Sequence, residues 1–237
     1  MTGFEKTKDG VRIFCDDEKF SAAFEKMRES LRERRGEILR DAMNEPKRKR
    51  LVLKTEIAGT PVVLKRECFI FRFDRSLKAL FFGSDARNIF RVSLRAQKKG
   101  FHGIPRTFFV AEKFTKGILR ETISAMEFLD GIPPRLPLSR KQAEEIETLM
   151  NDCHANGIIS GDVHPGNFLM TRDGAKLIDF RGEKVFPCIA KARDRLQLER
   201  VFGIPDRSRG IGEKLFFIQH ALRNVGRKLR GKAPIPD

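Results

Sequence analysis

Three polar residues, each placed beside a short apolar segment, constrain the fold of this chain more than any other feature. Asp162 and Asn167 stand five positions apart between the apolar residues 158–159 and 168–170, and Asp179 ends the next apolar segment. The 17 positions from Asp162 to Asp179 allow one loop and one short hairpin to bring the three side chains together. The sequence therefore predicts a fold that gathers two carboxylates and one amide at a loop.

These groups are the ones that phosphoryl transfer from ATP requires. One carboxylate must accept or orient the proton of the attacking hydroxyl, while an amide oxygen and a second carboxylate must hold the Mg²⁺ that neutralises the phosphates. Asp162 suits the first role, and Asn167 and Asp179 suit the second. The alternative is that all three are ordinary turn residues, because Gly, Asn and Asp concentrate in turns for conformational reasons. The agreement of the spacings favours the catalytic interpretation.

The remaining pattern predicts a strand-rich first half and a largely helical second half. In the first half we expect a helix over residues 17–44, a hairpin of 51–57 with 61–64, a helix over 85–99, and strands over 108–111 and 118–129. Asp130-Gly131 breaks the pattern and indicates a lobe boundary. In the second half we expect a helix capped by Ser139 and ending near Gly157, short strands over 158–159, 168–170 and 175–178, and then mainly helix. Residues 69–82 have a mixed pattern that predicts no element.

Composition narrows the choice of partners. The chain has 48 Lys and Arg against 32 Asp and Glu, a formal net charge of +16, which predicts nucleic acid, an anionic membrane surface or an anionic substrate as partner. The four Cys form no CxxC pair, so we expect reduced thiols without zinc or disulfides. No apolar run approaches the ~18 residues of a membrane span, and we expect a cytoplasmic protein, free or attached to a membrane surface.

The sequence around these polar residues resembles a known family. Ser160-Gly-Asp162-Val-His-Pro-Gly-Asn167, followed by Asp179-Phe180, resembles the catalytic and metal-binding loops of the protein-kinase-like fold. It is most similar to the lipopolysaccharide core heptose(II) kinase family, as are residues 111–113, 127–131 and 191–204. The resemblance is sharp over residues 139–204, looser back to Lys65, and weak in the first 50 residues.

The resemblance implies a single α+β domain over residues 1–237 with a two-lobed, protein-kinase-like fold. Residues 1–50 would form an N-terminal helical segment, residues 51–129 an antiparallel-sheet N-lobe, and residues 130–237 a mainly helical C-lobe with a basic C-terminal helix. That helix, over residues 211–229, interleaves apolar and basic residues. It either lies on a membrane or forms a core helix with a solvated basic face.

The resemblance also implies roles for individual residues. Lys65 would contact the α- and β-phosphates of ATP, and the backbone at Glu127 and Leu129 would bind adenine. Asp194 would steady the catalytic loop, the alternative being a surface charge on a helix. His164 would either contact substrate or phosphate, or only pack the turn.

Three departures from the kinase pattern accompany these similarities. No G-x-G-x-x-G precedes Lys65, only Gly59 in a tight hairpin. The helix expected to pair a Glu with Lys65 has none, so Asp85 or Glu67 replaces it or Lys65 lacks an ion pair. Arg181 stands where protein kinases place Gly.

The function implied is an ATP- and Mg²⁺-dependent phosphotransferase that phosphorylates a heptose hydroxyl of the lipopolysaccharide inner core. The positive charge suits an anionic, lipid-linked substrate and a peripheral position on the cytoplasmic face of the inner membrane. One alternative is a kinase of the same fold that acts on a protein or another small molecule. The other is an inactive kinase fold that only binds a partner. Nucleic acid is not expected, because the chain has no Trp or Tyr on which bases could stack.

Overall fold

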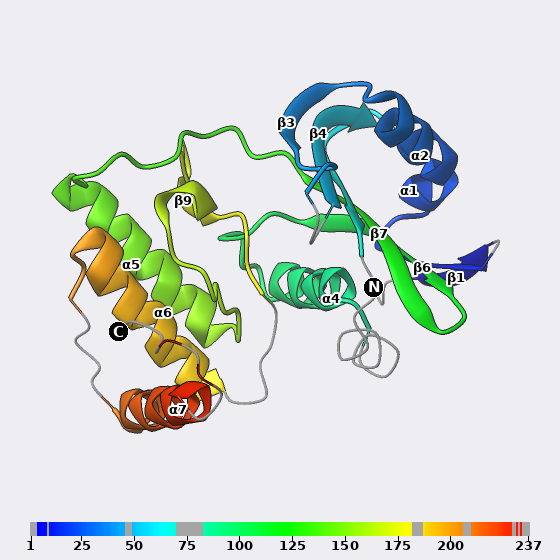
Figure 1. Cartoon of the computed structure of the whole chain (residues 1–237). Coiled ribbons are helices and arrows are strands. Elements are labelled where there is room, and N and C mark those ends of the chain that lie inside the picture. The colour runs from blue at the N-terminus through cyan, green and yellow to red at the C-terminus, as the bar shows by residue number, and fades with distance from the viewer. Residues whose placement is uncertain are drawn as a thin grey trace. The chain divides into compact units, whose positions relative to one another are not determined.

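Antiparallel strands dominate the first half of the chain and helices the second, so the structure belongs to the α+β class (Figure 1). The computed structural model describes residues 4–8, 10–45, 49–69, 83–181, 187–205, 210–228, 231 and 233. The chain divides into two compact units, residues 1–130 and 131–237.

The N-terminal unit is built on a sheet in which every neighbouring pair of strands is antiparallel. Its strands are β1 (Phe4–Lys8), β2 (Val11–Cys15), β3 (Glu37–Asp41), β4 (Lys49–Ile57), β5 (Thr60–Cys68), β6 (Thr107–Thr115) and β7 (Ile118–Glu127). Among the described residues their order across the sheet is β1-β2-β6-β7-β5-β4-β3. Both loop residues have positive φ in the turns Ala58-Gly59 and Lys116-Gly117, as two-residue hairpin turns require. The two hairpins β4–β5 and β6–β7 are thus specified by local turn chemistry.

Helices cover both faces of this sheet, as Figure 1 shows. On one face α1 (Glu18–Ala22) packs against β2 and β6, where Phe20 stacks on Phe108, and α2 (Phe24–Glu33) packs against β4 and β5; their apolar side chains join Val62 and Leu64 of β5 in one core. On the other face α4 (Asp85–Lys98) packs Phe90 against Val110 of β6. Because side chains alternate along a strand, Lys65 points away from Leu64 and lies on the face that α4 covers.

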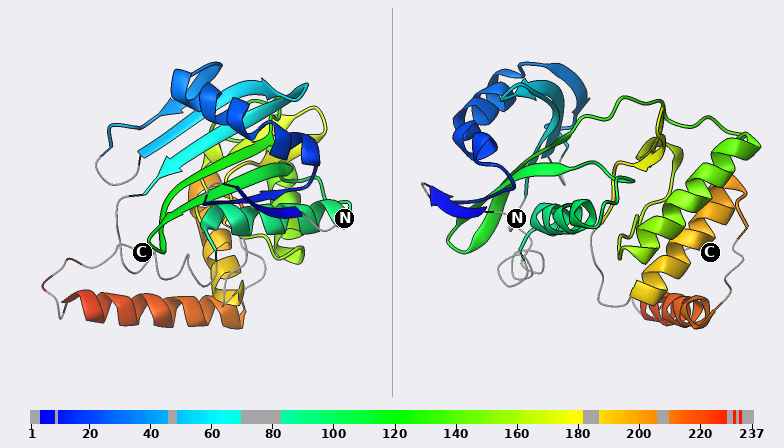
Figure 2. Two further views of the ribbon diagram at one scale, coloured as in Figure 1. Left: turned by 90° about the vertical axis from the view of Figure 1, so that its right-hand side faces the viewer. Right: turned by 180° about the vertical axis from the view of Figure 1, so that it is seen from behind.

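The C-terminal unit is mainly helical. Its elements are α5 (Arg140–Ala155), the 3₁₀ turn η1 (Pro165–Asn167), the hairpin of β8 (Phe168–Thr171) and β9 (Gly174–Leu177), α6 (Pro187–Phe202) and α7 (Ile211–Lys228). Ser139 begins α5 with a capping box, since its hydroxyl accepts from the Gln142 N–H and the Gln142 side chain accepts from the Ser139 N–H. In Figure 2, α5 and α6 lie side by side and α7 crosses the end of α6. Within the described ranges, no helix is both long and apolar enough to span a membrane.

Most elements predicted from the sequence are confirmed. The β4–β5 hairpin, α4, β6, β7, the Ser139-capped helix and the β8–β9 hairpin all occupy the predicted segments. The α+β class, with an antiparallel sheet and a largely helical C-terminal part, is also confirmed. Strands β1 and β2 precede the predicted helix of residues 17–44 and lie within residues 1–50, for which a helical segment was expected. Of the unassigned segment 69–82, residues 70–82 lie outside the described residues.

The helix predicted over residues 17–44 is wrong in its second half, where β3 forms instead. Helix α2 ends because Arg34 adopts a left-handed conformation with φ 56°. A Cβ on Gly36 would lie 2.4 Å from the Lys54 carbonyl oxygen, so the chain approaches β4 closely there and joins the sheet. The helical spacing of Ile38 and Leu39 misled the prediction, because both side chains are exposed on this strand.

The strand predicted over residues 158–159 is also wrong. Among the described residues this segment has no strand partner and uses its backbone groups elsewhere: the Ile158 N–H donates to the Cys153 carbonyl at the end of α5, and the Ile159 carbonyl accepts from the Arg181 N–H. Its apolar side chains are nevertheless buried, which explains the strand-like pattern.

Candidate functional site

A buried carboxylate on α6 holds the loop that leads to Asp162. Asp194 is fully buried, and its two oxygens accept the backbone N–H groups of Ser160 and Gly161, each at 2.8 Å. His154 Nε2, from α5, lies 3.2 Å from Asp194 Oδ2. The alternative that Asp194 is a surface charge on a helix is therefore wrong: this side chain steadies the loop, as the family resemblance implied.

Asp162 and Asn167 are linked by a short hydrogen bond. The Asn167 side-chain amide donates from Nδ2 to the Asp162 backbone carbonyl at 2.7 Å. The amide nitrogen is thereby committed to the loop, which leaves the amide oxygen of this buried residue as its remaining polar atom. The Asp162 carboxylate is 62% exposed, so its backbone is held while its side chain stays accessible.

Asp179 is brought next to Asn167 by the backbone. The Ile178 N–H donates to the Asn167 carbonyl at 2.9 Å, and the Arg181 N–H donates to the Ile159 carbonyl at 2.8 Å. Phe180 is buried between these two anchors, whereas Asp179 is exposed. The structure thus brings Asp162, Asn167 and Asp179 to one loop and hairpin. Within the described part of the chain, no three His, Cys, Asp or Glu side chains form a group that could hold a metal ion.

His164 lies between the turn and Asp162. Its Nδ1 accepts the Gly166 N–H at 3.1 Å, which caps η1. In the neutral ring the proton then resides on Nε2, which lies 3.9 Å from Asp162 Oδ2. His164 therefore caps the turn and its ring also faces the Asp162 carboxylate, while contact with substrate or phosphate stays a prediction.

Arg181, which stands where protein kinases have Gly, lies against the loop. Gly161 has φ +71°, and a Cβ there would be 2.8 Å from the Arg181 Cδ. The glycine conformation and the absence of a side chain at position 161 make room for the longer residue at position 181.

Lys65, in the N-terminal unit, has an ion-pair partner on its own strand. Lys65 Nζ lies 3.4 Å from Glu67 Oε1, and the same oxygen lies 2.8 Å from Arg50 Nε on β4. Glu67 and Arg50 are direct cross-strand neighbours, which places the carboxylate between two cations. Of the two candidates to replace the missing helix glutamate, the partner is Glu67; Asp85 is exposed in the first turn of α4.

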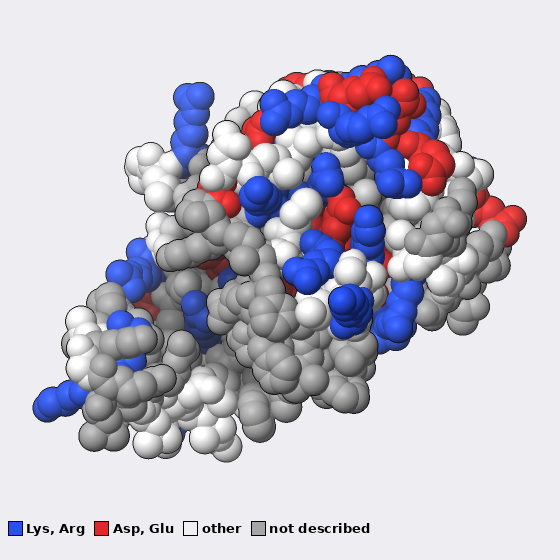
Figure 3. Space-filling view, turned by 45° about the vertical axis from the view of Figure 1, so that its right-hand side comes forward, with Lys and Arg blue, Asp and Glu red and all other residues white. Residues whose placement is uncertain are grey.

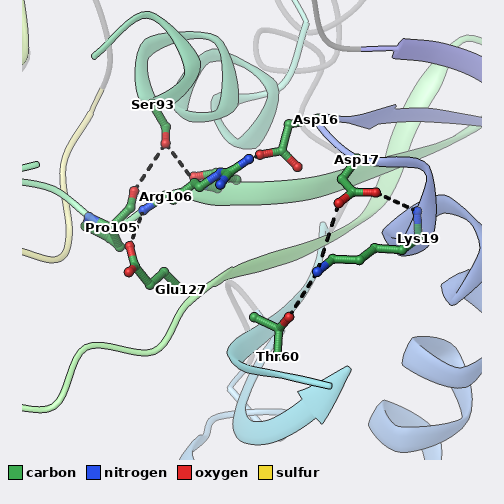
Figure 4. A network of polar contacts seen from close by, with 9 residues as sticks. Asp16, Asp17, Lys19, Thr60, Ser93, Pro105, Arg106 and Glu127 are labelled. Atoms are coloured by element: carbon green, nitrogen blue, oxygen red, sulfur yellow. Dashed lines mark hydrogen bonds and ion pairs between the residues drawn. The ribbon is translucent and has the colours of Figure 1, made fainter. Parts of the chain in front are cut away.

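Glu127, at the end of β7, is fixed by the segment before β6 (Figure 4). The Arg106 N–H donates to Glu127 Oε2 at 3.0 Å, and the Glu127 N–H donates to the Arg106 carbonyl at 2.8 Å. One of the two bonds between these residues therefore ends on the carboxylate and not on a backbone oxygen. Leu129 is half-buried two residues later.

The Arg106 side chain extends this network to Asp16, as Figure 4 also shows. Its Nε donates to Asp16 Oδ2 at 2.7 Å. Burial raises the pKa of Asp16 above its usual value, and the Arg106 guanidinium partly opposes this shift. The Ser93 hydroxyl of α4 accepts the Thr107 N–H and donates to the Pro105 carbonyl, so that α4 is tied to the same segment.

Several residues of these networks escaped sequence reasoning, among them Asp16, Arg106, His154 and Gln197, whose Oε1 accepts the Val163 N–H. Only His154 left a signal in the sequence. It stands beside the apolar positions 146, 149, 150 and 153 of α5, where a polar residue indicates a buried partner.

Comparison with known proteins agrees with the resemblance seen in residues 139–204. A family model described as lipopolysaccharide core biosynthesis protein (WaaY) matches residues 8–232. A relative from Escherichia coli K12, named lipopolysaccharide core heptose(II) kinase WaaY, is 30% identical over 165 residues, which is 68% of this chain and 70% of the relative. A second Escherichia coli protein of that name is 32% identical over 168 residues, 68% and 71% of the two chains. The chain therefore belongs to the WaaY family of lipopolysaccharide core biosynthesis proteins.

Proposed function

We propose that this chain is an ATP-dependent kinase with a two-lobed, protein-kinase-like fold, which phosphorylates a heptose hydroxyl of the lipopolysaccharide inner core. The two Escherichia coli relatives carry the name of that activity. The observation that carries the proposal is the anchoring of the loop at residues 160–167. Asp194 holds its start and the Asn167 amide holds the Asp162 carbonyl, while the Asp162 carboxylate remains exposed. A catalytic carboxylate needs a fixed backbone and an accessible side chain.

In this proposal Asp162 accepts or orients the proton of the attacking sugar hydroxyl. Asn167 Oδ1 and the Asp179 carboxylate would hold Mg²⁺. Their oxygen donors fit a hard cation that takes its other ligands from phosphate and water, and the ion supplies charge neutralisation of the phosphates. His164 Nε2, 3.9 Å from Asp162 Oδ2, would orient that carboxylate.

For the nucleotide, we propose that Lys65 contacts the α- and β-phosphates and that Glu67 keeps the ammonium in place. The backbone at Glu127 and Leu129 would bind the adenine ring. Supporting this assignment, the Arg106 N–H is bonded to the Glu127 carboxylate, so the Glu127 carbonyl is not needed for that bond.

For the acceptor, we propose the inner core still linked to lipid, reached from a peripheral position on the cytoplasmic face of the inner membrane. A chain with a net charge of +16 is attracted to such an anionic surface, at about 1 kcal/mol for each basic residue close to it. Figure 3 shows that Asp and Glu gather among Lys and Arg at one end of the N-terminal unit. Around the end of α2, Arg34 pairs with Asp41 of β3 at 2.9 Å, and Arg35 pairs with Glu33 at 2.6 Å.

Transfer of label from γ-labelled ATP in the presence of Mg²⁺ tests the proposal, with dephosphorylated core lipopolysaccharide and a generic protein as parallel acceptors. We expect label in the lipopolysaccharide, its loss in Asp162→Asn, and nearly unchanged ATP binding in that variant. Asp173→Asn, in the exposed turn between β8 and β9, is the matched control and should retain full transfer. Label only in the protein acceptor would favour the alternative kinase, and ATP binding without transfer to any acceptor would favour an inactive fold.

A further inference from the structure

Helix α7 carries an exposed apolar stripe along its whole length. The residues are spaced alternately by four and three positions, which places them on one side of a helix. They are Ile211, Leu215, Ile218, Leu222 and Val225, and their exposed fractions lie between 38 and 77%. We refer to these five residues as the α7 stripe.

The opposite side of α7 packs against α6. A Cβ on Gly212 would lie 2.6 Å from the Cys188 carbonyl oxygen, so the two helices approach closely at this point. Phe216, one turn further along, is only partly exposed. The crossing of α6 by α7 in Figure 2 agrees with this contact. The solvated side of α7 thus carries apolar residues together with the exposed Lys214 and Lys228, and a membrane position for residues 211–229 stays a prediction.

The charges that border the α7 stripe are basic. Lys214 stands one helical turn from Ile211 and Ile218, Lys228 stands one turn from Val225, and both lysines are exposed. The single acidic residue of α7, Glu213, is half-buried and lies one turn from Phe216, on the side that faces α6. An apolar strip bordered by lysines matches the surface of an anionic bilayer, in which lysine stems extend from the apolar zone to the headgroups.

A second copy of the chain is a poorer partner for this surface. Pairing two α7 stripes would bring Lys214 and Lys228 near their own counterparts, and each chain carries a net charge of +16. The repulsion between like charges opposes that contact, whereas an anionic lipid surface removes it.

We propose that the α7 stripe is a membrane-docking surface, on which α7 lies in the plane of an anionic phospholipid bilayer with its apolar side chains at the headgroup–acyl boundary. The inference deepens the proposed function by naming the surface that would hold the enzyme beside a lipid-linked acceptor. Docking needs neither ATP nor transfer, so it can fail or succeed independently of the kinase assignment.

Sedimentation of the full-length chain with vesicles tests this proposal without nucleotide. We compare phosphatidylcholine vesicles with vesicles that also contain phosphatidylglycerol, using wild type and the double variant Ile218→Gln/Leu222→Gln. We expect wild type to bind the anionic vesicles and the double variant to bind them roughly tenfold more weakly. The double variant lacks two apolar side chains that would be buried in the bilayer on docking. The matched control is Ile38→Gln/Leu39→Gln, which removes two exposed apolar side chains from β3 and should bind like wild type.

The contribution of charge is measured separately with Lys214→Gln and Lys228→Gln. Each should weaken binding to anionic vesicles by about fivefold, the factor that corresponds to ~1 kcal/mol for a basic residue at an anionic surface. Both substitutions affect exposed side chains, so far-UV circular dichroism should be unchanged.

The absence of Trp and Tyr allows a direct reporter of insertion, since Leu222→Trp carries the only indole of the chain. We expect its emission to shift to shorter wavelength on anionic vesicles, while Leu39→Trp does not shift. Vesicle binding that is unaffected by Ile218→Gln/Leu222→Gln would overturn the proposal, as that binding would come from the overall charge. A concentration-dependent blue shift of Leu222→Trp without vesicles would also overturn it, in favour of contact between two copies.

Discussion

Replacing Asp194 by Ala should destabilise the C-terminal unit because its carboxylate satisfies two buried backbone N–H groups. Ser160 and Gly161 each donate to it at 2.8 Å, and His154 Nε2 lies 3.2 Å away. Alanine removes all three contacts at a position with no solvent exposure. The two N–H groups would then be left without an acceptor in the interior.

The expected loss is about 2–4 kcal/mol in the free energy of unfolding. An unsatisfied buried donor costs about 1–3 kcal/mol, which gives a range of about 2–6 kcal/mol for two N–H groups. Removing the carboxylate also removes the cost of keeping a charge out of water, so we expect the lower part of that range. Since total stabilities are about 5–15 kcal/mol, this loss is large.

Urea unfolding followed by far-UV circular dichroism measures this change, because the chain lacks Trp and Tyr for intrinsic fluorescence. The matched control is Ser160→Ala, whose hydroxyl is buried without a hydrogen-bond partner among the described residues. It should unfold within roughly 1 kcal/mol of wild type. Asp194→Asn keeps one acceptor oxygen and should fall between the two. An Asp194→Ala variant as stable as Ser160→Ala would refute the view that Asp194 holds the loop.

Three further predictions concern other parts of the molecule. Glu67→Gln removes the carboxylate between Lys65 and Arg50, and we expect a drop of roughly tenfold in transfer that Glu67→Asp partly restores, measured with labelled ATP. Asp179→Ala, or chelation of Mg²⁺ by EDTA, should abolish transfer, and unchanged transfer would contradict the metal assignment. Arg106→Gln should lower unfolding stability at neutral pH by roughly 1–2 kcal/mol, because it leaves the buried Asp16 carboxylate unpaired. This deficit should shrink as the pH falls through the raised pKa of Asp16, where the protonated form no longer needs a cation, and a deficit independent of pH would contradict it.

Features governed by nearest neighbours could be predicted from the sequence. The turn at Ala58-Gly59 needs positive φ at both residues, and glycine supplies one of them. Ser139 and Gln142 form the capping box three residues apart. The catalytic candidates Asp162 and Asn167 belong to this class as well, because the hydrogen bond that joins them spans only five positions.

Features that depend on distant segments could not be predicted. Asp16 and Arg106 are 90 positions apart, and nothing in either local sequence names the other. The end of α2 depends on the left-handed conformation of Arg34, a residue type that gives no warning of it. The separation of the α7 stripe from the side that packs on α6 was equally hidden, because apolar residues such as Phe216 occur on both sides.

Burial separates the acids that build this protein from the acids that we propose for chemistry. Asp194 is fully buried and accepts two loop N–H groups, and Glu112 is fully buried and accepts the Ser84 N–H at the start of α4 at 2.7 Å. A carboxylate that is fully buried and bonded to backbone N–H groups cannot reach a hydroxyl of a substrate outside the core. By contrast, Asp162, on the loop that Asp194 holds, and Asp179, just after β9, are both exposed.

In the sequence alone, nothing separates the buried acids Asp194 and Glu112 from the exposed acids Asp162 and Asp179. Only their packing distinguishes them. The division also explains why the Asp194 and Asp162 variants should behave differently. Loss of a buried acid changes the free energy of unfolding first and activity as a consequence, whereas loss of an exposed acid removes transfer from a protein that remains folded. A variant of Asp162 that unfolds like Asp194→Ala would therefore contradict its proposed role, even if it had lost all activity.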